Sequence, residues 1–204
     1  MQHGKFITIE GPEGSGKSTH SRLLCAYLRR KGRRIVHTRE PGGTKISESI
    51  RDVLLSRKNK GMADACELLL FMAARAQIVN EVIKPALKKG YIVVCDRFHD
   101  ATVAYQGYGA GMDLRVIESL RKLATGGLKP DLTVLLDVES RAGLKRGGAH
   151  DRMERKSLDF HRRVRDGYLK LAKKEPRRIK VINTTCSPIK EVQGSLRKAV
   201  EDAV

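Results

Sequence analysis

Short apolar runs rich in β-branched residues recur along the chain, separated by longer stretches with helical spacing. Each run is nearly continuous in apolar residues rather than alternating, which is typical of strands covered on both faces in a parallel sheet. The runs are FITIE (6–10), RIVHTR (34–39), YIVVCD (91–96), LTVLLD (132–137) and IKVIN (179–183). Their alternation with helices predicts an α/β fold, a doubly wound five-stranded parallel sheet flanked by helices, in a single domain over residues 1–204.

The stretches between the runs predict the helices of this domain. Helical spacing extends over 17–31, 63–83, 113–124 and 154–173. Pro85 is expected to end or kink the helix that contains 63–83. In sheets of this kind ligands bind beyond the carboxyl ends of the strands, so candidate chemistry is sought there.

Composition is typical of a globular protein of the cytoplasm. The 204 residues can bury a core, and 40% hydrophobic with 31% charged residues indicates a soluble domain. No apolar run approaches the ~20 residues of a membrane span, and the N-terminus MQHGKFITIE lacks the apolar core of a secretory signal. The cysteines stand singly, so reduced thiols are expected, with Cys25 and Cys95 buried inside apolar segments.

The net charge of +18 indicates anionic partners. However, only 4% of the residues are aromatic, and no RNP-like, zinc-finger or basic-zipper pattern is present. The basic clusters at 27–34 and 173–180 flank turns or helix ends, where solvated charge is ordinary. The sequence therefore argues against specific nucleic-acid binding. The positive charge is nevertheless larger than an enzyme that binds only small anions requires.

The loop after the first run carries a phosphate-binding motif. GPEGSGKS, residues 11–18, matches G-x-x-x-x-G-K-[ST] between a strand and a helix, a context that favours a phosphate-binding loop (P-loop) over a simple glycine-rich turn. Glycines let backbone N–H groups converge on an anion, Lys17 can reach terminal phosphates, and Ser18 can offer its hydroxyl to Mg²⁺. The predicted contacts to the nucleoside triphosphate are Gly11, Pro12, Glu13, Gly14, Ser15, Gly16, Lys17, Ser18 and Thr19.

Two further strand ends carry arginines. Arg39 closes the second run, and Asp96 with Arg97 closes the third. Arginine holds phosphate in a fixed orientation through parallel hydrogen bonds, and an acid after a buried strand is suited to hold Mg²⁺ through water. The alternative for Arg39 is a salt bridge to Glu40 or a role at a helix end. Together the two arginines predict a phosphate acceptor beside the donor.

Several longer segments share their order and residues with one family. They are REPGGT (39–44), LLLFMAARAQ (68–77), DRFHDATVAYQG (96–107), KPDLTVLLD (129–137) and DRMERKSLDFHRRVRDGYLKLA (151–172). With the P-loop and its Glu13, they make the chain resemble thymidylate kinases over most of residues 5–175. The resemblance implies a P-loop NTPase fold of the nucleoside monophosphate kinase type, and transfer of the ATP γ-phosphoryl to dTMP with Mg²⁺, giving dTDP for dTTP biosynthesis. It also implies a homodimer. Gly14 departs from family members that have an arginine there.

The resemblance assigns roles at the sugar and phosphates. It places Glu13 against the 3′-hydroxyl of dTMP, and Arg39 and Arg97 on the monophosphate. Asp96 matches the acid beside the metal, which with Ser18 makes the predicted Mg²⁺ site.

For the base, the resemblance implies that Phe71 stacks on thymine, that Arg75 bonds to it, and that Thr102 and Gln106 line the pocket. Phe71 and Arg75 are four residues apart, so a helix presents both on one side. An ordinary core position is the alternative for Phe71.

A short lid at about 144–152 is also implied. Its cations are Lys145, Arg146, His150 and Arg152. The resemblance places Arg146 over the adenine of ATP. We expect Arg146 or Arg152 to contact the transferring phosphoryl, with pairing of Arg152 to Asp151 or Glu154 as the alternative. The predicted catalytic residues are Lys17, Arg97, Arg146 and Arg152.

Three rival functions remain open at this point. A deoxynucleoside kinase would need a base near the 5′-hydroxyl, for which Glu40 or Asp100 is available. A GTP-dependent switch typically carries an N-K-x-D segment, which this sequence lacks. A basic nucleic-acid-associated protein would bind in a salt-dependent manner.

Overall fold

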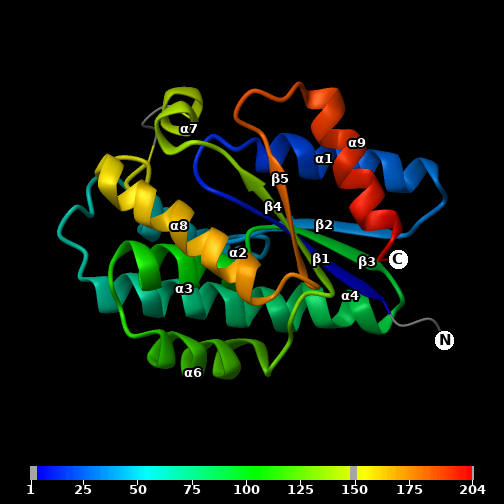
Figure 1. The fold of residues 1–204 in the computed structure, drawn as a ribbon. Helices are drawn as coiled ribbons and strands as arrows, with labels where there is room; N and C mark the ends of the chain where they lie inside the picture. The colour runs from blue at the N-terminus through cyan, green and yellow to red at the C-terminus, as the bar shows by residue number, and fades with distance from the viewer. Residues whose placement is uncertain (1–3, 148–150, 204) are drawn as a thin grey trace.

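A parallel sheet runs through the centre of the molecule, with its strands at the predicted segments (Figure 1). The structure is a computed structural model that describes residues 4–147 and 151–203. Within these residues five strands form one sheet in the order β2-β3-β1-β4-β5, and every pair of neighbours is parallel. The strands are β1 (Lys5–Glu10), β2 (Ile35–Arg39), β3 (Ile92–Asp96), β4 (Leu132–Asp137) and β5 (Ile179–Asn183). The predicted doubly wound sheet is confirmed.

Burial along the strands differs between the centre and the edges of the sheet. Strands β1, β3 and β4 are buried almost throughout, as predicted. The prediction was wrong for β2 and β5, which expose part of their length, and Val181 in β5 is 47% exposed. An edge strand pairs on one side only, so its apolar residues are less completely covered.

Helices cover both faces of the sheet (Figure 1). On one face α1 and α9 pack together, and Leu24, Leu28, Val192 and Leu196 join the strand residues in one apolar cluster. The other face carries the two longest helices, α3 and α8 (Figure 1). The helical segments are α1 (Lys17–Arg30), α2 (Lys45–Leu55), α3 (Asp64–Ile78), η1 (Val79–Ile83), α4 (Lys84–Lys88), α5 (His99–Thr102), η2 (Val103–Gly109), α6 (Leu114–Thr125), α7 (Ser140–Gly147), α8 (Leu158–Lys174) and α9 (Ile189–Glu201).

Pro85 neither ends the long helix nor interrupts its path. The chain remains helical from α3 through the π-helical segment η1 into α4, where Pro85 occupies the first turn. A proline inside a helix removes one hydrogen bond and clashes with the carbonyl four residues earlier. The wider π-helical turn just before Pro85 changes that hydrogen-bond register, so the helix continues.

The expected lid is partly helical. Helix α7 includes residues 144–147 at its C-terminal end. At its start the carboxylate of Glu139 accepts a hydrogen bond from the Ala142 N–H at 2.8 Å, which satisfies one of the free N–H groups of the first turn. His150 lies outside the described residues. The expected burial of Cys25 and Cys95 is confirmed. None of the helices in the described ranges has the length and apolar character needed to cross a bilayer.

Candidate active site

The register of the sheet brings three strand ends together. Asp96 is level with Ile9 on one side and with Arg39 on the other, so the loops after β1, β3 and β2 leave the sheet side by side. A cavity of about 360 Å³ lies at this edge. Its position beyond the carboxyl ends of parallel strands is the one expected for a ligand site.

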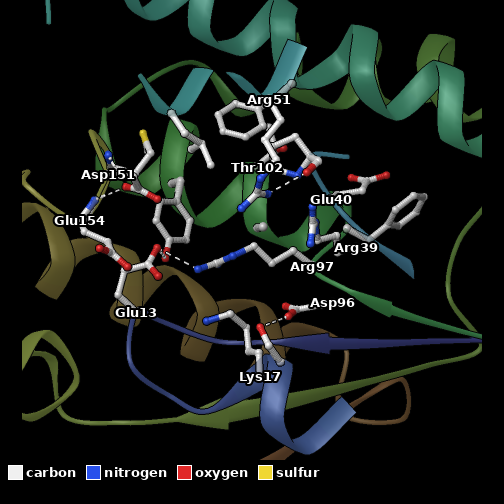
Figure 2. A pocket seen from close by; sticks show the side chains of 18 of the residues that line it. Glu13, Lys17, Arg39, Glu40, Arg51, Asp96, Arg97, Thr102, Asp151 and Glu154 are labelled. Atoms are coloured by element: carbon white, nitrogen blue, oxygen red, sulfur yellow. Dashed lines mark hydrogen bonds and ion pairs between the residues drawn. The ribbon is translucent and has the colours of Figure 1, made fainter. Parts of the chain in front are cut away.

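Most of the predicted site residues line this one cavity. They are Glu13, Gly14, Gly16, Lys17, Ser18, Thr19, Arg39, Phe71, Arg75, Asp96, Arg97, Thr102 and Gln106. The described lining residues do not include Gly11, Pro12, Ser15, Arg146 or Arg152. Figure 2 shows the Arg97 side chain crossing the middle of the cavity toward Glu13, with Lys17 and Asp96 on one side of it.

The loop after β1 forms a compact cradle at the start of α1. Gly16 has φ 86°, a left-handed conformation that suits glycine, and the helix begins at the next residue, Lys17. Lys17 Nζ donates to the Pro12 carbonyl at 2.7 Å and to Ser15 Oγ at 3.3 Å. Burial, with a contribution from the Arg97 charge, lowers the pKa of Lys17 to about 8, against the opposing effect of Glu13. A phosphate in the cradle would favour its charged form.

Ser18 and Asp96 meet at the base of the cradle, where Ser18 Oγ donates to Asp96 Oδ2 at 2.6 Å. A hydroxyl and a carboxylate are the hard oxygen donors that suit Mg²⁺, which usually takes only one or two protein ligands beside substrate phosphates and water. In the described ranges no group of three or more His, Cys, Asp or Glu side chains converges as a metal site would require if the protein alone held the ion. Ser18 and Asp96 therefore suit a Mg²⁺ ion that binds together with the nucleotide.

Arg97 has an unusual backbone and a dense set of partners. Its φ of 68° lies in the left-handed region, which is rare for a side-chain-bearing residue and is often found at functional sites. The guanidinium donates to Glu13 Oε1 at 2.8 Å and to the Gly11 carbonyl at 3.1 Å, and it lies over the Tyr105 ring. Tyr105 also donates its hydroxyl proton to Glu13 Oε1 at 2.8 Å.

Glu13 balances the positive charge at the centre of the cavity. Burial by itself would raise the pKa of Glu13, but the charges of Arg97 and Lys17 and the Tyr105 hydrogen bond lower it to about 2. Glu13 is therefore ionised at neutral pH. Its carboxylate can accept a hydrogen bond between the P-loop and the residues expected to bind the phosphate acceptor.

The far end of the cavity is organised around a buried arginine. Arg75 Nε donates to Glu40 Oε2 at 2.7 Å, and its terminal nitrogens donate to Thr102 Oγ1 at 3.0 Å and to the Phe98 carbonyl at 3.1 Å. Burial raises the pKa of Glu40 to about 7, although Arg75 opposes the rise. Phe71 lines the cavity one turn earlier on α3. A flat apolar ring and a fixed donor thus border the same space.

Arg39 pairs with Glu48 at 3.1 Å, not with Glu40 as the alternative interpretation had it, because Glu40 is already held by Arg75. Arg51 lines the cavity although the sequence analysis did not assign it. It lies on α2, a helix that was not predicted, so only the amphipathic pattern of that segment would have indicated it. Burial and the charges of Arg39 and Arg97 lower the pKa of Arg51, so three arginines share a region that an anion would stabilise.

The two lid arginines lie elsewhere. Arg146 on α7 donates to the backbone carbonyls of Thr184, at 2.9 Å, and Thr185 in the loop after β5. Arg152 is buried and forms an ion pair with Glu67 at 2.6 Å. The alternative expected for Arg152 was a pair with Asp151 or Glu154, whereas the structure pairs its guanidinium with the buried carboxylate of Glu67. Arg152 is not among the described residues that line the cavity.

Gly14 contacts the lid helix directly. A Cβ on Gly14 would lie 1.9 Å from the carbonyl oxygen of Gly143, and a Cβ on Gly143 would lie 2.3 Å from the carbonyl oxygen of Glu13. The two glycines thus allow α7 to approach the P-loop at backbone distance. This packing is a physical reason for the absence of an arginine at position 14.

One of the two candidate general bases lies away from the cavity. Asp100 accepts from both terminal nitrogens of Arg178, at 2.6 Å and 2.8 Å, and from Thr133, and it is not among the described lining residues. Glu40 lines the cavity but is occupied by Arg75. The geometry therefore offers little to a reaction that needs a base at a hydroxyl acceptor.

The chain is similar to known proteins over most of its length. The family model for thymidylate kinase matches residues 9–196. The chain belongs to the thymidylate kinase family. The thymidylate kinase of Geotalea uraniireducens is 48% identical over 97% of this chain and 96% of its own length. That of Symbiobacterium thermophilum is 47% identical over 98% and 94%. A crystal structure of thymidylate kinase from Ehrlichia chaffeensis superposes with a TM-score of 0.82 at 38% identity, covering 97% of this chain and 99% of that one. The family is one of phosphotransferases, and this relation confirms the predicted fold and enzyme class.

Proposed function

We propose that this chain transfers the γ-phosphoryl group of ATP to dTMP, giving ADP and dTDP. The observation that carries the proposal is the single cavity shared by the P-loop, with Lys17 and Ser18, and by an acceptor end, with Phe71 and Arg75. A switch or an ATPase needs the first set of groups but not the second. Membership of the thymidylate kinase family supports the same assignment.

The reacting groups need positioning and positive charge. Phosphoryl transfer passes through a loose transition state with charge spread over the equatorial oxygens. Lys17 binds the terminal phosphates of ATP, and Arg97, Arg39 and Arg51 orient the anionic acceptor. No general base is needed, because the acceptor oxygen belongs to a phosphate that is already ionised. Ser18 and, through water, Asp96 would hold Mg²⁺, which would supply charge neutralisation on the phosphates.

At the nucleoside end Phe71 stacks on the base and Arg75 donates to it, with Thr102 and Gln106 completing the pocket. Glu13 accepts from the sugar 3′-hydroxyl, for which its ionised carboxylate is suited. These roles extend the resemblance to the geometry of this cavity, in which the Arg75 guanidinium is fixed by Glu40 and Thr102.

For the lid we propose that Arg146 remains near the adenine, because it bridges α7 and the loop after β5 beside the P-loop. We assign no contact with the transferring phosphoryl to Arg152. Residues 144–147 and 151–152 would close over ATP and exclude water, which suppresses hydrolysis.

Coupled detection of ADP, with dTMP, UMP, dCMP and AMP offered separately as acceptors, tests the function. The highest kcat/KM is expected with dTMP. Equal turnover with any other of these monophosphates would refute the substrate assignment, and ADP release that ignores the acceptor would refute the transfer itself.

We further propose a cytoplasmic homodimer. Helix α3 packs against both α2 and α6, and several large apolar side chains on these three helices face solvent. They include Ile46, Val53, Leu69, Val116 and Leu123, the last 82% exposed. Large apolar side chains that gather on a surface mark interaction sites, so we propose that these helices form the dimer interface. Sedimentation velocity should give a dimer that Leu69→Glu converts to monomer, and a wild-type monomer at micromolar concentration would refute the proposal.

A further inference from the structure

A buried carboxylate stands behind the base end of the cavity. Glu67 on α3 is 1% exposed, and it is not among the described residues that line the cavity. Gln106 does line it, and Gln106 Nε2 donates to Glu67 Oε1 at 2.8 Å. On its other side Glu67 forms ion pairs with Arg152 at 2.6 Å and with Lys156 at 3.7 Å. The carboxylate thus connects the segment after the lid to a residue of the base pocket.

The chemistry of this contact fixes which end of the Gln106 amide meets a ligand. An ionised carboxylate only accepts hydrogen bonds, and the carboxylate of Glu67 forms ion pairs with Arg152 and Lys156. Gln106 must therefore turn its NH₂ group toward Glu67. The amide oxygen, an acceptor, is then the polar atom that Gln106 has left for the cavity.

Next to this acceptor the cavity has a fixed donor, the guanidinium of Arg75. Arg75 donates to Thr102 Oγ1 at 3.0 Å, and Thr102 lies four residues before Gln106 on the continuous α5–η2 segment. On one edge of thymine the 4-oxo acceptor lies next to the N3–H donor. These two groups complement a protein donor that lies next to a protein acceptor. Cytosine presents the opposite pattern, with a 4-amino donor beside an N3 acceptor.

We propose that Glu67 is a positioning residue that fixes the polarity of the Gln106 amide and thereby selects a base with an N3–H donor. This inference rests on the proposed function, since it concerns how the acceptor base is chosen. It also gives Arg152 a physical role: together with Lys156 it holds Glu67 as an acceptor, so that Gln106 has one orientation and not two.

The test compares two substrates that share the 5-methyl group, dTMP and 5-methyl-dCMP. In the variant Glu67→Gln, residue 67 can donate as well as accept, so the Gln106 amide can turn over and offer its NH₂ group to the cavity. The ratio of kcat/KM values, dTMP over 5-methyl-dCMP, should fall about five- to hundredfold, the range expected when one buried hydrogen bond is mismatched. Discrimination by Arg75 is common to both enzymes and cancels. Glu175→Gln is the matched control, because it removes a carboxylate from another arginine pair outside the cavity and should leave the ratio unchanged.

Three results separate the outcomes. If the wild type does not phosphorylate dTMP, the proposed function fails. If it does, and Glu67→Gln lowers kcat/KM equally for both substrates, Glu67 is only structural and the inference is overturned. Should Glu67→Gln not fold, Gln106→Leu decides, because loss of the amide oxygen must reduce the same ratio; an unchanged ratio in Gln106→Leu would overturn the inference. Where both variants fold, adding Glu67→Gln to Gln106→Leu should change the ratio no further.

Discussion

The charge of Glu13 should stabilise the ligand-free protein by an amount that depends on pH. In the folded protein its pKa is about 2, compared with an ordinary value of 4.5. A difference of about 2.5 pH units, at 1.36 kcal/mol per unit, corresponds to about 3 kcal/mol. The Glu13 side chain is only 14% exposed, so solvent screens this interaction little. Glu13→Gln should therefore lower the free energy of unfolding at pH 7 by up to about 3 kcal/mol, the limit being reached if glutamine recovers none of the interaction with Arg97.

The pH dependence separates charge from shape. A carboxyl group whose pKa is lowered by folding stabilises the protein fully above its unfolded pKa, and the stabilisation is lost as the pH falls toward the folded pKa. The difference between wild type and Glu13→Gln should be constant from pH 7 to about 5.5 and should shrink to less than half of its full size by about pH 3.

Urea denaturation of both proteins at several pH values from 3 to 7, without nucleotide, measures this difference. Asp159→Asn is the control, since Asp159 pairs with Arg162 on the surface and should contribute less than about 1 kcal/mol. A stability difference between wild type and Glu13→Gln that is the same at pH 3 and pH 7 would show that hydrogen-bond geometry, and not charge, explains the effect of Glu13.

Three further predictions concern the same cavity. Arg97→Ala should raise the KM for dTMP at least about tenfold, the loss of one charge-assisted hydrogen bond, with a smaller effect on the KM for ATP; an unchanged KM for dTMP in steady-state kinetics would remove the acceptor site. Ser18→Ala should raise the Mg²⁺ concentration needed for half-maximal activity, and a magnesium titration that superposes on wild type would contradict the role given to the contact between Ser18 and Asp96. Gly14→Ala should lower stability by about 2–4 kcal/mol, because a left-handed alanine costs about 1 kcal/mol and overpacking against α7 about 1–3 kcal/mol more. Gly32 has a similar positive φ, 76° compared with 67° at Gly14, but open space around it, so Gly32→Ala should show the first cost alone in thermal unfolding.

Local patterns decided much of the fold. Every predicted strand is present within one residue of its expected bounds, because near-continuous apolar runs are what a doubly covered sheet requires. The P-loop motif, Arg39 at the end of β2 and Arg97 directly after β3 were identified from their positions in the sequence. Since parallel strands end at the same edge, Lys17, Arg39 and Arg97 were expected to lie near one another, and they line one cavity.

Only the tertiary structure decided which charges pair. Glu40 pairs with Arg75, and Arg39 pairs with Glu48. Arg152 pairs with Glu67 on α3, a residue to which the sequence pattern assigned no role. A buried charge must find a partner among groups from every segment packed around it, and sequence spacing cannot rank partners that distant elements bring into contact. The same limit applies to Gly14, whose neighbour on α7 lies far along the chain. The sequence by itself therefore determined the sheet, the phosphate loop and the edge where the site lies, whereas packing between remote elements decided how that site is charged and oriented.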